Sequence, residues 1–127
     1  MVKLTIEGIQ KAQNANLAHV RSLRPEGSFG DAVKTATILS QQSAVRKTHV
    51  LTGSLRGSHR IKLTGLRGTV YIDPNSVNPR SGGKPYDYGV IEHAKGGQHA
   101  FYRRVVDEDG KSIAVASAKE YLRGMPR

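Results

Sequence analysis

The segment from residue 59 to residue 72 constrains the fold most strongly, because it alternates side chains with the period of a β-strand. In the first half, His59, Ile61 and Leu63 alternate with the basic or polar residues Arg60, Lys62 and Thr64. Gly65 lies where a turn is needed, and Thr69-Val70-Tyr71-Ile72 returns with β-branched and aromatic residues. The pattern predicts a β-hairpin with one apolar and one basic face.

Two helical segments precede this hairpin. Apolar residues recur on one helical face between residues 8 and 23, and Arg24-Pro25-Glu26-Gly27 then interrupts the pattern. Ser28 is a good N-cap, and Asp31 follows at the spacing of an acidic capping box. We therefore expect a second, long helix over residues 29–47, with many small residues on its packing face.

The remaining segments are shorter. Val2, Leu4 and Ile6 alternate with polar residues, which predicts a short strand or extended arm over residues 2–6. Thr52-Gly53-Ser54 breaks the pattern between the long helix and the hairpin. Residues 73–85 are rich in Pro, Gly, Asn and Ser, so we expect an interaction loop that orders on assembly.

The C-terminal third predicts a short ordered segment and one more helix. Residues 86–94 are interpreted as helical or extended, Gly96-Gly97 breaks that segment, and the last helix is expected over residues 101–122. Together the elements predict one α+β domain over residues 1–127. It has two N-terminal helices, a small antiparallel β-sheet with a hairpin, and a C-terminal helix packed on the sheet.

Composition limits the classes of protein. The 127 residues include no cysteine, so disulfides, zinc–thiolate sites and Cys nucleophiles are excluded. The sequence has neither the apolar run of a transmembrane helix nor a signal peptide, so we expect no membrane contact. Apolar residues make up 37%, without tryptophan, and such a thin core is typical of domains that a partner subunit completes.

Motifs for catalysis or cofactor binding are lacking in the sequence. There is no P-loop and no G-x-S-x-G elbow, and Glu92, His93 and His99 match no standard zinc spacing. Asp107-Glu108-Asp109 is interpreted as a solvated acidic patch, since adjacent helical residues point apart. We expect no enzymatic activity, no cofactor and no metal.

The formal net charge of +10 favours polyanionic partners. Arg60, Lys62 and Arg67 beside Tyr71 suit a phosphate backbone with a stacked base, as in nucleic-acid binding. The same face also suits an acidic neighbour in a protein assembly. The sequence leaves both interpretations open.

Three stretches in order resemble the phage tail-component family, the neck or tail-completion proteins of long-tailed bacteriophages. The first is Val2-Lys-Leu-Thr-Ile-Glu-Gly-Ile9, similar to that family's strand, glycine and first helix. The second is Val45-Arg-Lys-Thr-His-Val-Leu-Thr-Gly-Ser-Leu-Arg-Gly-Ser58, which resembles its step from a long helix into a strand. The third joins Tyr86-Asp-Tyr-Gly-Val-Ile-Glu-His93 to His99-Ala-Phe-Tyr-Arg-Arg104; Ala94 and Ala100 depart from the family pattern there.

The resemblance implies a structural virion protein, made in the cytoplasm of the bacterial host. It would form a homo-oligomeric ring at the head–tail junction, as a neck (head–tail connector), tail-completion or tail-terminator protein. The ring would be hexameric, or dodecameric nearer the portal, between head-closure and tail-tube proteins, with non-specific contact to genomic DNA in the channel. The hypothetical interface residues are Arg56, Arg60, Lys62, Arg67, Arg80, Lys84, Glu92, His93, Arg103 and Arg104. The alternative is a small basic nucleic-acid-binding protein acting outside the virion.

Overall fold

The computed structural model describes residues 13–48 and 53–124. A first helix covers residues 13–22 of this part. The other elements follow in chain order: α2 (Ser28–Lys47), η1 (Arg56–Ser58), β1 (His59–Thr64), β2 (Arg67–Ile72), α3 (Pro85–Ala94), η2 (Gly97–His99), α4 (Phe101–Arg104), η3 (Val105–Asp109) and α5 (Gly110–Arg123).

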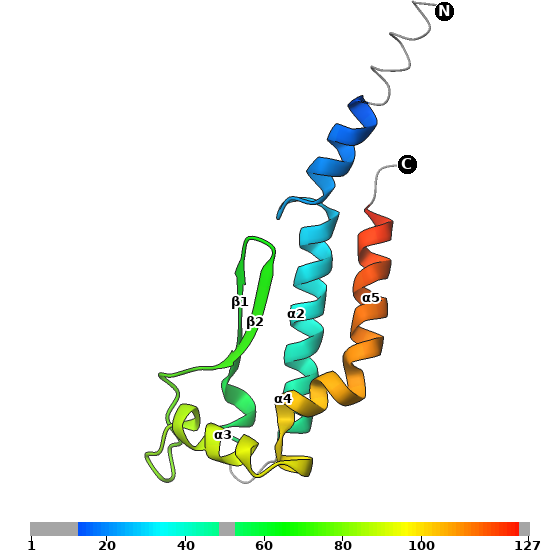
Figure 1. Cartoon of the computed structure of the whole chain (residues 1–127). Helices are drawn as coiled ribbons and strands as arrows, with labels where there is room; N and C mark the ends of the chain where they lie inside the picture. The colour runs from blue at the N-terminus through cyan, green and yellow to red at the C-terminus, as the bar shows by residue number, and fades with distance from the viewer. Residues whose placement is uncertain (1–12, 49–52, 125–127) are drawn as a thin grey trace, which may run out of the picture.

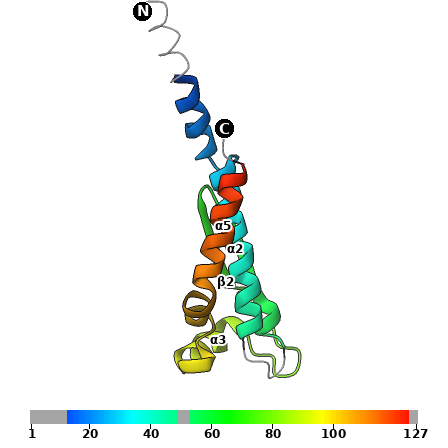
Figure 2. The same cartoon turned by 90° about the vertical axis from the view of Figure 1, so that its right-hand side faces the viewer.

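The helix α2 is the centre of the arrangement. Figure 1 shows the hairpin on one side of α2 and α5 on the other, and both make extensive contacts with α2. Figure 2, turned by 90°, again places α5 alongside α2. The helix of residues 13–22 precedes α2 and extends from its N-terminal end away from the rest of the molecule. The helices α3 and α4 lie at the opposite end of α2.

The predicted α+β class is confirmed, with its antiparallel hairpin and its C-terminal helix. The packing differs from the prediction in one respect. The helix that covers the hairpin is α2, and α5 packs on the other side of α2 instead of on the sheet. Small and hydroxylated residues on α2 explain this, because they let two neighbours approach the same helix closely.

The approach of the hairpin to α2 requires a glycine. Gly68 pairs with Leu63 in the hairpin register, on the face that packs against α2. A Cβ atom on Gly68 would lie 1.7 Å from Thr37 Oγ1 and 2.8 Å from Thr37 Cβ. The Thr37 hydroxyl donates to the Val33 carbonyl at 2.7 Å, which holds the side chain against its own helix. Any side chain at residue 68 would push the hairpin off α2.

The start of α2 is shifted from the prediction by one residue. Gly27 is the N-cap, and its carbonyl accepts the amide of Asp31 at 3.1 Å. Ser28 is the first helical residue, and its Oγ is buried without a hydrogen-bond partner among the described residues, so the prediction of a Ser28 cap was wrong. A Cβ atom on residue 27 would lie 2.4 Å from the Arg21 carbonyl oxygen, so the tight turn places a glycine at the cap.

The C-terminal part agrees with the sequence pattern. The segment predicted as helical or extended is the helix α3, with Pro85 as its first residue. Gly96 and Gly97 have φ angles of 72° and 55° and interrupt the helical structure after α3. Residues Phe101 to Arg123 are helical as α4, η3 and α5, and Figure 1 shows that the helical path changes direction between α4 and α5, where the π-helical segment η3 lies. The strand predicted over residues 2–6 lies outside the described residues.

A buried histidine connects the ends of three elements. The ring of His59 is 2% exposed, with Nε2 at 2.7 Å from Thr48 Oγ1 and Nδ1 at 2.9 Å from the Tyr102 hydroxyl. Thr48 donates its only hydroxyl proton to the Ala44 carbonyl at 2.6 Å, so Thr48 must accept from Nε2–H. Tyr102 must then donate to Nδ1. These bonds need a neutral imidazole.

We predict that this imidazole makes the fold sensitive to acid. Burial, and next the charge of Arg60, lower the pKa of His59 from 6.5 to about 4. The unfolded chain therefore binds the proton first, and stability is lost as the pH falls from 6.5 towards 4. The loss amounts to about 3 kcal/mol. Urea unfolding at several pH values should show it. The variant His59→Gln should lack the slope above pH 5, and a wild-type stability that stays constant from pH 7 to pH 4.5 would contradict the assignment.

Candidate interface surface

Six side chains form an exposed surface on the hairpin, which we call the basic hairpin face. In an antiparallel sheet, directly paired residues lie on the same face. The register pairs the outward-facing residues two by two: Arg60 with Tyr71, Lys62 with Thr69, and Thr64 with Arg67. All six are exposed, and residues 59–72 contain no acidic residue. The sequence pattern predicted one basic face on the hairpin, and the structure turns this face away from α2, since Gly68 on the opposite face packs against Thr37.

The basic residues of this face differ in whether hydrogen bonds and ion pairs within the chain hold their side chains. The guanidinium group of Arg60 donates to the Gly57 carbonyl at 2.7 Å and lies 3.6 Å from an Asp73 carboxylate oxygen. Arg60 is therefore anchored and partly neutralised at the base of the hairpin. Lys62 and Arg67 lie nearer the tip of the hairpin, and both residues are exposed. The charge available to a partner is carried mainly by Lys62 and Arg67.

Arg56, a predicted interface residue, makes hydrogen bonds within the chain that the sequence did not predict, and its interface role stays a prediction. Its Nε donates to the Val45 carbonyl at 2.7 Å, and a terminal nitrogen donates to the Arg46 carbonyl at 3.2 Å. These carbonyls lie in the last turn of α2, where helical oxygens lack partners and a positive charge is favourable. The structure thus uses Arg56 to cap α2 and does not place it on the basic hairpin face.

Arg104 is also bound within the chain. Its Nε lies 2.6 Å from a carboxylate oxygen of Glu108, and it donates to the Gln98 carbonyl at 3.1 Å. The hydrogen bond from Arg104 holds the pKa of the Glu108 carboxyl below its usual value. Arg104 therefore fixes η2 and η3 around α4. Its neighbour Arg103 is exposed.

Glu92 and His93 lie at the end of α3 and serve the local structure. The Glu92 carboxylate accepts from His99 Nδ1, and from Lys95 Nζ at 3.0 Å. These bonds, that from His99 first, lower the pKa of Glu92. The ring of His93 packs edge-to-face on Phe101, with centroids 5.1 Å apart. The helix α3, which carries both residues, lies at the end of the molecule opposite to the tip of the hairpin (Figure 1).

Arg80 and Lys84 are exposed on the predicted interaction loop, of which the last residue, Pro85, belongs to α3. The loop has its own hydrogen bonds around the buried Asn78. The Asn78 amide donates to the Gly83 carbonyl at 2.7 Å, and Asn78 Oδ1 accepts the Arg80 amide at 2.9 Å. The loop thus has a defined turn within the single chain. Its contact with a neighbouring ring stays a prediction.

An apolar groove between α2 and α5 is the main feature that the sequence analysis missed. It has a volume of about 490 Å³, and its lining includes Leu23, Phe29, Val33, Ala36, Ala118 and Tyr121. The rings of Phe29 and Tyr121 meet edge-to-face at 5.9 Å. The α2 half follows from the small-residue stripe predicted for residues 29–47, but which helix would lie opposite depends on tertiary packing.

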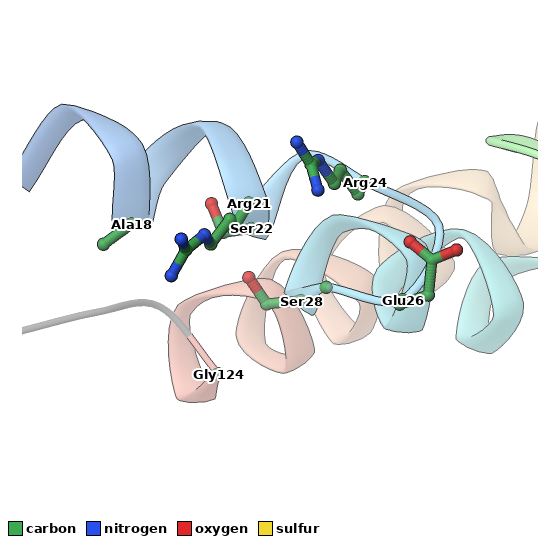
Figure 3. Close-up of a pocket in the computed structure, with 8 residues that line it drawn as sticks. Ala18, Arg21, Ser22, Arg24, Glu26, Ser28 and Gly124 are labelled. Carbon is green, nitrogen blue, oxygen red and sulfur yellow. The ribbon is translucent and has the colours of Figure 1, made fainter.

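A second depression, of about 600 Å³, lies where the helix of residues 13–22 meets the body. Figure 3 shows its lining, in which Arg21, Arg24 and Glu26 point in different directions. Because charges of both signs line it, we assign no ligand to it. No cluster of three potential metal ligands, and no helix able to cross a membrane, occurs in the described part of the chain.

Comparisons with protein families, curated proteins and solved structures find no match to this chain.

We predict different effects for two of the basic residues. Arg56→Ala should lower the free energy of unfolding by about 1.5–3 kcal/mol, because the carbonyls at the end of α2 lose a charged donor. Lys62→Ala, a matched loss of one exposed positive charge, should change it by less than about 0.5 kcal/mol. Urea denaturation at neutral pH measures both. Equal effects of the two substitutions would refute the division into a capping and a surface residue.

Proposed function

We propose that this chain is a non-enzymatic structural protein of a tailed bacteriophage, and that it forms a ring at the head–tail junction. The resemblance of three stretches to the tail-component family supports this proposal. The observation that carries it furthest is the basic hairpin face, an exposed surface whose strands contain no acidic residue. Such a surface suits docking on an acidic ring above or below.

Charge complementarity at this face would serve mainly docking specificity and association rate. A neighbouring head-closure or tail-tube protein with acidic residues on its rim would meet Lys62 and Arg67 first, since these extend from the hairpin. Arg80, Lys84 and Arg103 are further exposed cations. In the virion, some of these side chains would face the channel and contact the genomic DNA without sequence preference.

The exposed apolar surface fits an assembly protein as well. Among the described residues the buried apolar core is small, whereas many large apolar side chains are exposed, Val90 by 66% and Val106 by 70%. Subunits of a ring bury such surfaces through two different patches that close on rotation. Sixfold symmetry matches most tail rings, and twelvefold symmetry is the option nearer the portal.

The alternative function is nucleic-acid binding outside the virion. One observation favours it: Tyr71 is 38% exposed and lies on the same face as the three cations, as a base-stacking residue would. Light scattering with and without short duplex DNA separates the two functions. We expect a ring, or a monomer whose mass DNA does not change. A monomer that binds DNA tightly and loses about 10³-fold in affinity between 50 and 200 mM salt would favour the alternative.

We predict that charge reversal on the basic hairpin face prevents the joining of heads and tails. The double variant Lys62→Glu/Arg67→Glu should fail to complement a deletion of the gene, leaving filled heads and separate tails in electron micrographs. The matched control Lys111→Glu/Lys119→Glu places the same charge change on exposed residues of α5 and should give joined particles. Normal particles from the hairpin variant would refute docking through this face.

A further inference from the structure

The helix of residues 13–22 carries apolar side chains that its own chain leaves uncovered. Leu17 and Val20 are each 52% exposed, and Leu23, in the turn that follows, is 49% exposed. With spacings of three residues these side chains lie along one side of the helix. Short helices are marginal in water without tertiary packing. This helix therefore requires a partner surface.

The turn after the helix keeps it away from its own body. A Cβ atom on Gly27 would lie 2.4 Å from the Arg21 carbonyl oxygen, and one on Gly30 would lie 1.9 Å from the Pro25 carbonyl oxygen. The end of the helix and the start of α2 are thus packed backbone to backbone, which fixes their relative direction. Figure 1 shows the helix continuing outward from the end of α2, and Figure 3 shows the tight turn from the side.

The apolar groove between α2 and α5 supplies a surface of the required kind on the same molecule. Leu23 lines the groove and also ends the apolar side of the helix, so the two surfaces are continuous. In the sequence, the residues that precede this helix include the apolar Val2, Leu4, Ile6 and Ile9. The fixed turn directs the helix of residues 13–22, with Leu17 and Val20, away from its own groove and towards a neighbouring molecule.

We propose that the helix of residues 13–22 of one copy packs in the apolar groove of a second copy of this chain. The helix and the groove are different surfaces, so the contact is heterologous and leaves one free helix and one free groove at the ends of any open oligomer. Such a contact continues until a ring closes. This inference deepens the proposed ring function, on which it rests for its setting, and it names the contact between subunits.

Cross-linking tests the contact directly, because the chain contains no cysteine. In the double variant Val20→Cys/Ala118→Cys, one cysteine is on the helix and the other in the groove, at exposed positions. A short bismaleimide should give a ladder of dimers, trimers and higher oligomers. The control Val20→Cys/Ser112→Cys, with the second cysteine on an exposed residue of α5 outside the groove lining, should give no ladder. Equal products from the two variants would overturn the proposal.

Mixing variants tests whether the contact is heterologous. Val20→Glu blocks the helix and Ala118→Glu blocks the groove, and both side chains are exposed, so folding should persist. Each variant alone should be monomeric, and their mixture should form a one-to-one dimer that grows no further. Dimers of either variant alone, or no dimer in the mixture, would refute the contact. If the mixed variants form no dimer but head–tail joining still depends on Lys62 and Arg67, the proposed function stands and the contact is refuted. If the mixed variants form the dimer but joining does not depend on Lys62 and Arg67, the contact stands and the proposed function is refuted.

Discussion

The buried imidazole of His59 determines where the hairpin begins relative to the helices. Its two nitrogen atoms are bonded to Thr48, directly after α2, and to Tyr102 in α4. Because the Thr48 hydroxyl proton is already donated to Ala44, only one tautomer satisfies every group in this chain of bonds. The first residue of β1 is thereby fixed, and with it the alternation along the strand. A slip of one residue would turn Arg60 and Lys62 towards α2, so the exposure of the basic hairpin face depends on this interaction.

The second constraint is that α2 packs on two sides at once. Its buried residues are Ser28, Ala32, Thr37, Ser43 and Ala44, all small. Two of their hydroxyls donate hydrogen bonds: Thr37 to the Val33 carbonyl, and Ser43 to the Asp109 carboxylate at 2.5 Å. The bond from Ser43, followed by that from Lys47, lowers the pKa of Asp109. A central helix of this kind permits close packing but buries little apolar surface. Larger apolar side chains are therefore left at the ends and edges of the molecule, where subunit contacts can cover them.

The sequence was sufficient for features that depend on local patterns and insufficient for those that depend on distant partners. The period-two pattern from His59 predicted both strands, their faces and the cations on the outer face. Gly53, with a φ angle of 81°, and Gly96 were recognised as breaks. The capping role of Arg56 escaped prediction, because the carbonyls it binds are about ten residues away along a bent chain. The packing of α5 on α2 and the bonds of His59 also join segments with no shared sequence signal. Ser28 was misassigned because the geometry of the preceding turn determines which residue is the N-cap. Only glycine fits at residue 27, where a Cβ atom would lie 2.4 Å from the Arg21 carbonyl oxygen.

The distribution of partners among the basic residues also bears on the proposed assembly. Arg56 and Arg104 bind carbonyl and carboxylate oxygens within the chain, so their charge stabilises the fold and is little available outside it. Lys62 and Arg67 are exposed on the far side of the hairpin from α2, whereas the apolar groove lies between α2 and α5. The chain thus separates a charged surface from an apolar one on different sides of its central helix. Under the proposed function these surfaces suit two kinds of contact: charge for docking onto a neighbouring ring, which salt weakens, and apolar burial for holding subunits together within one ring, which salt does not weaken.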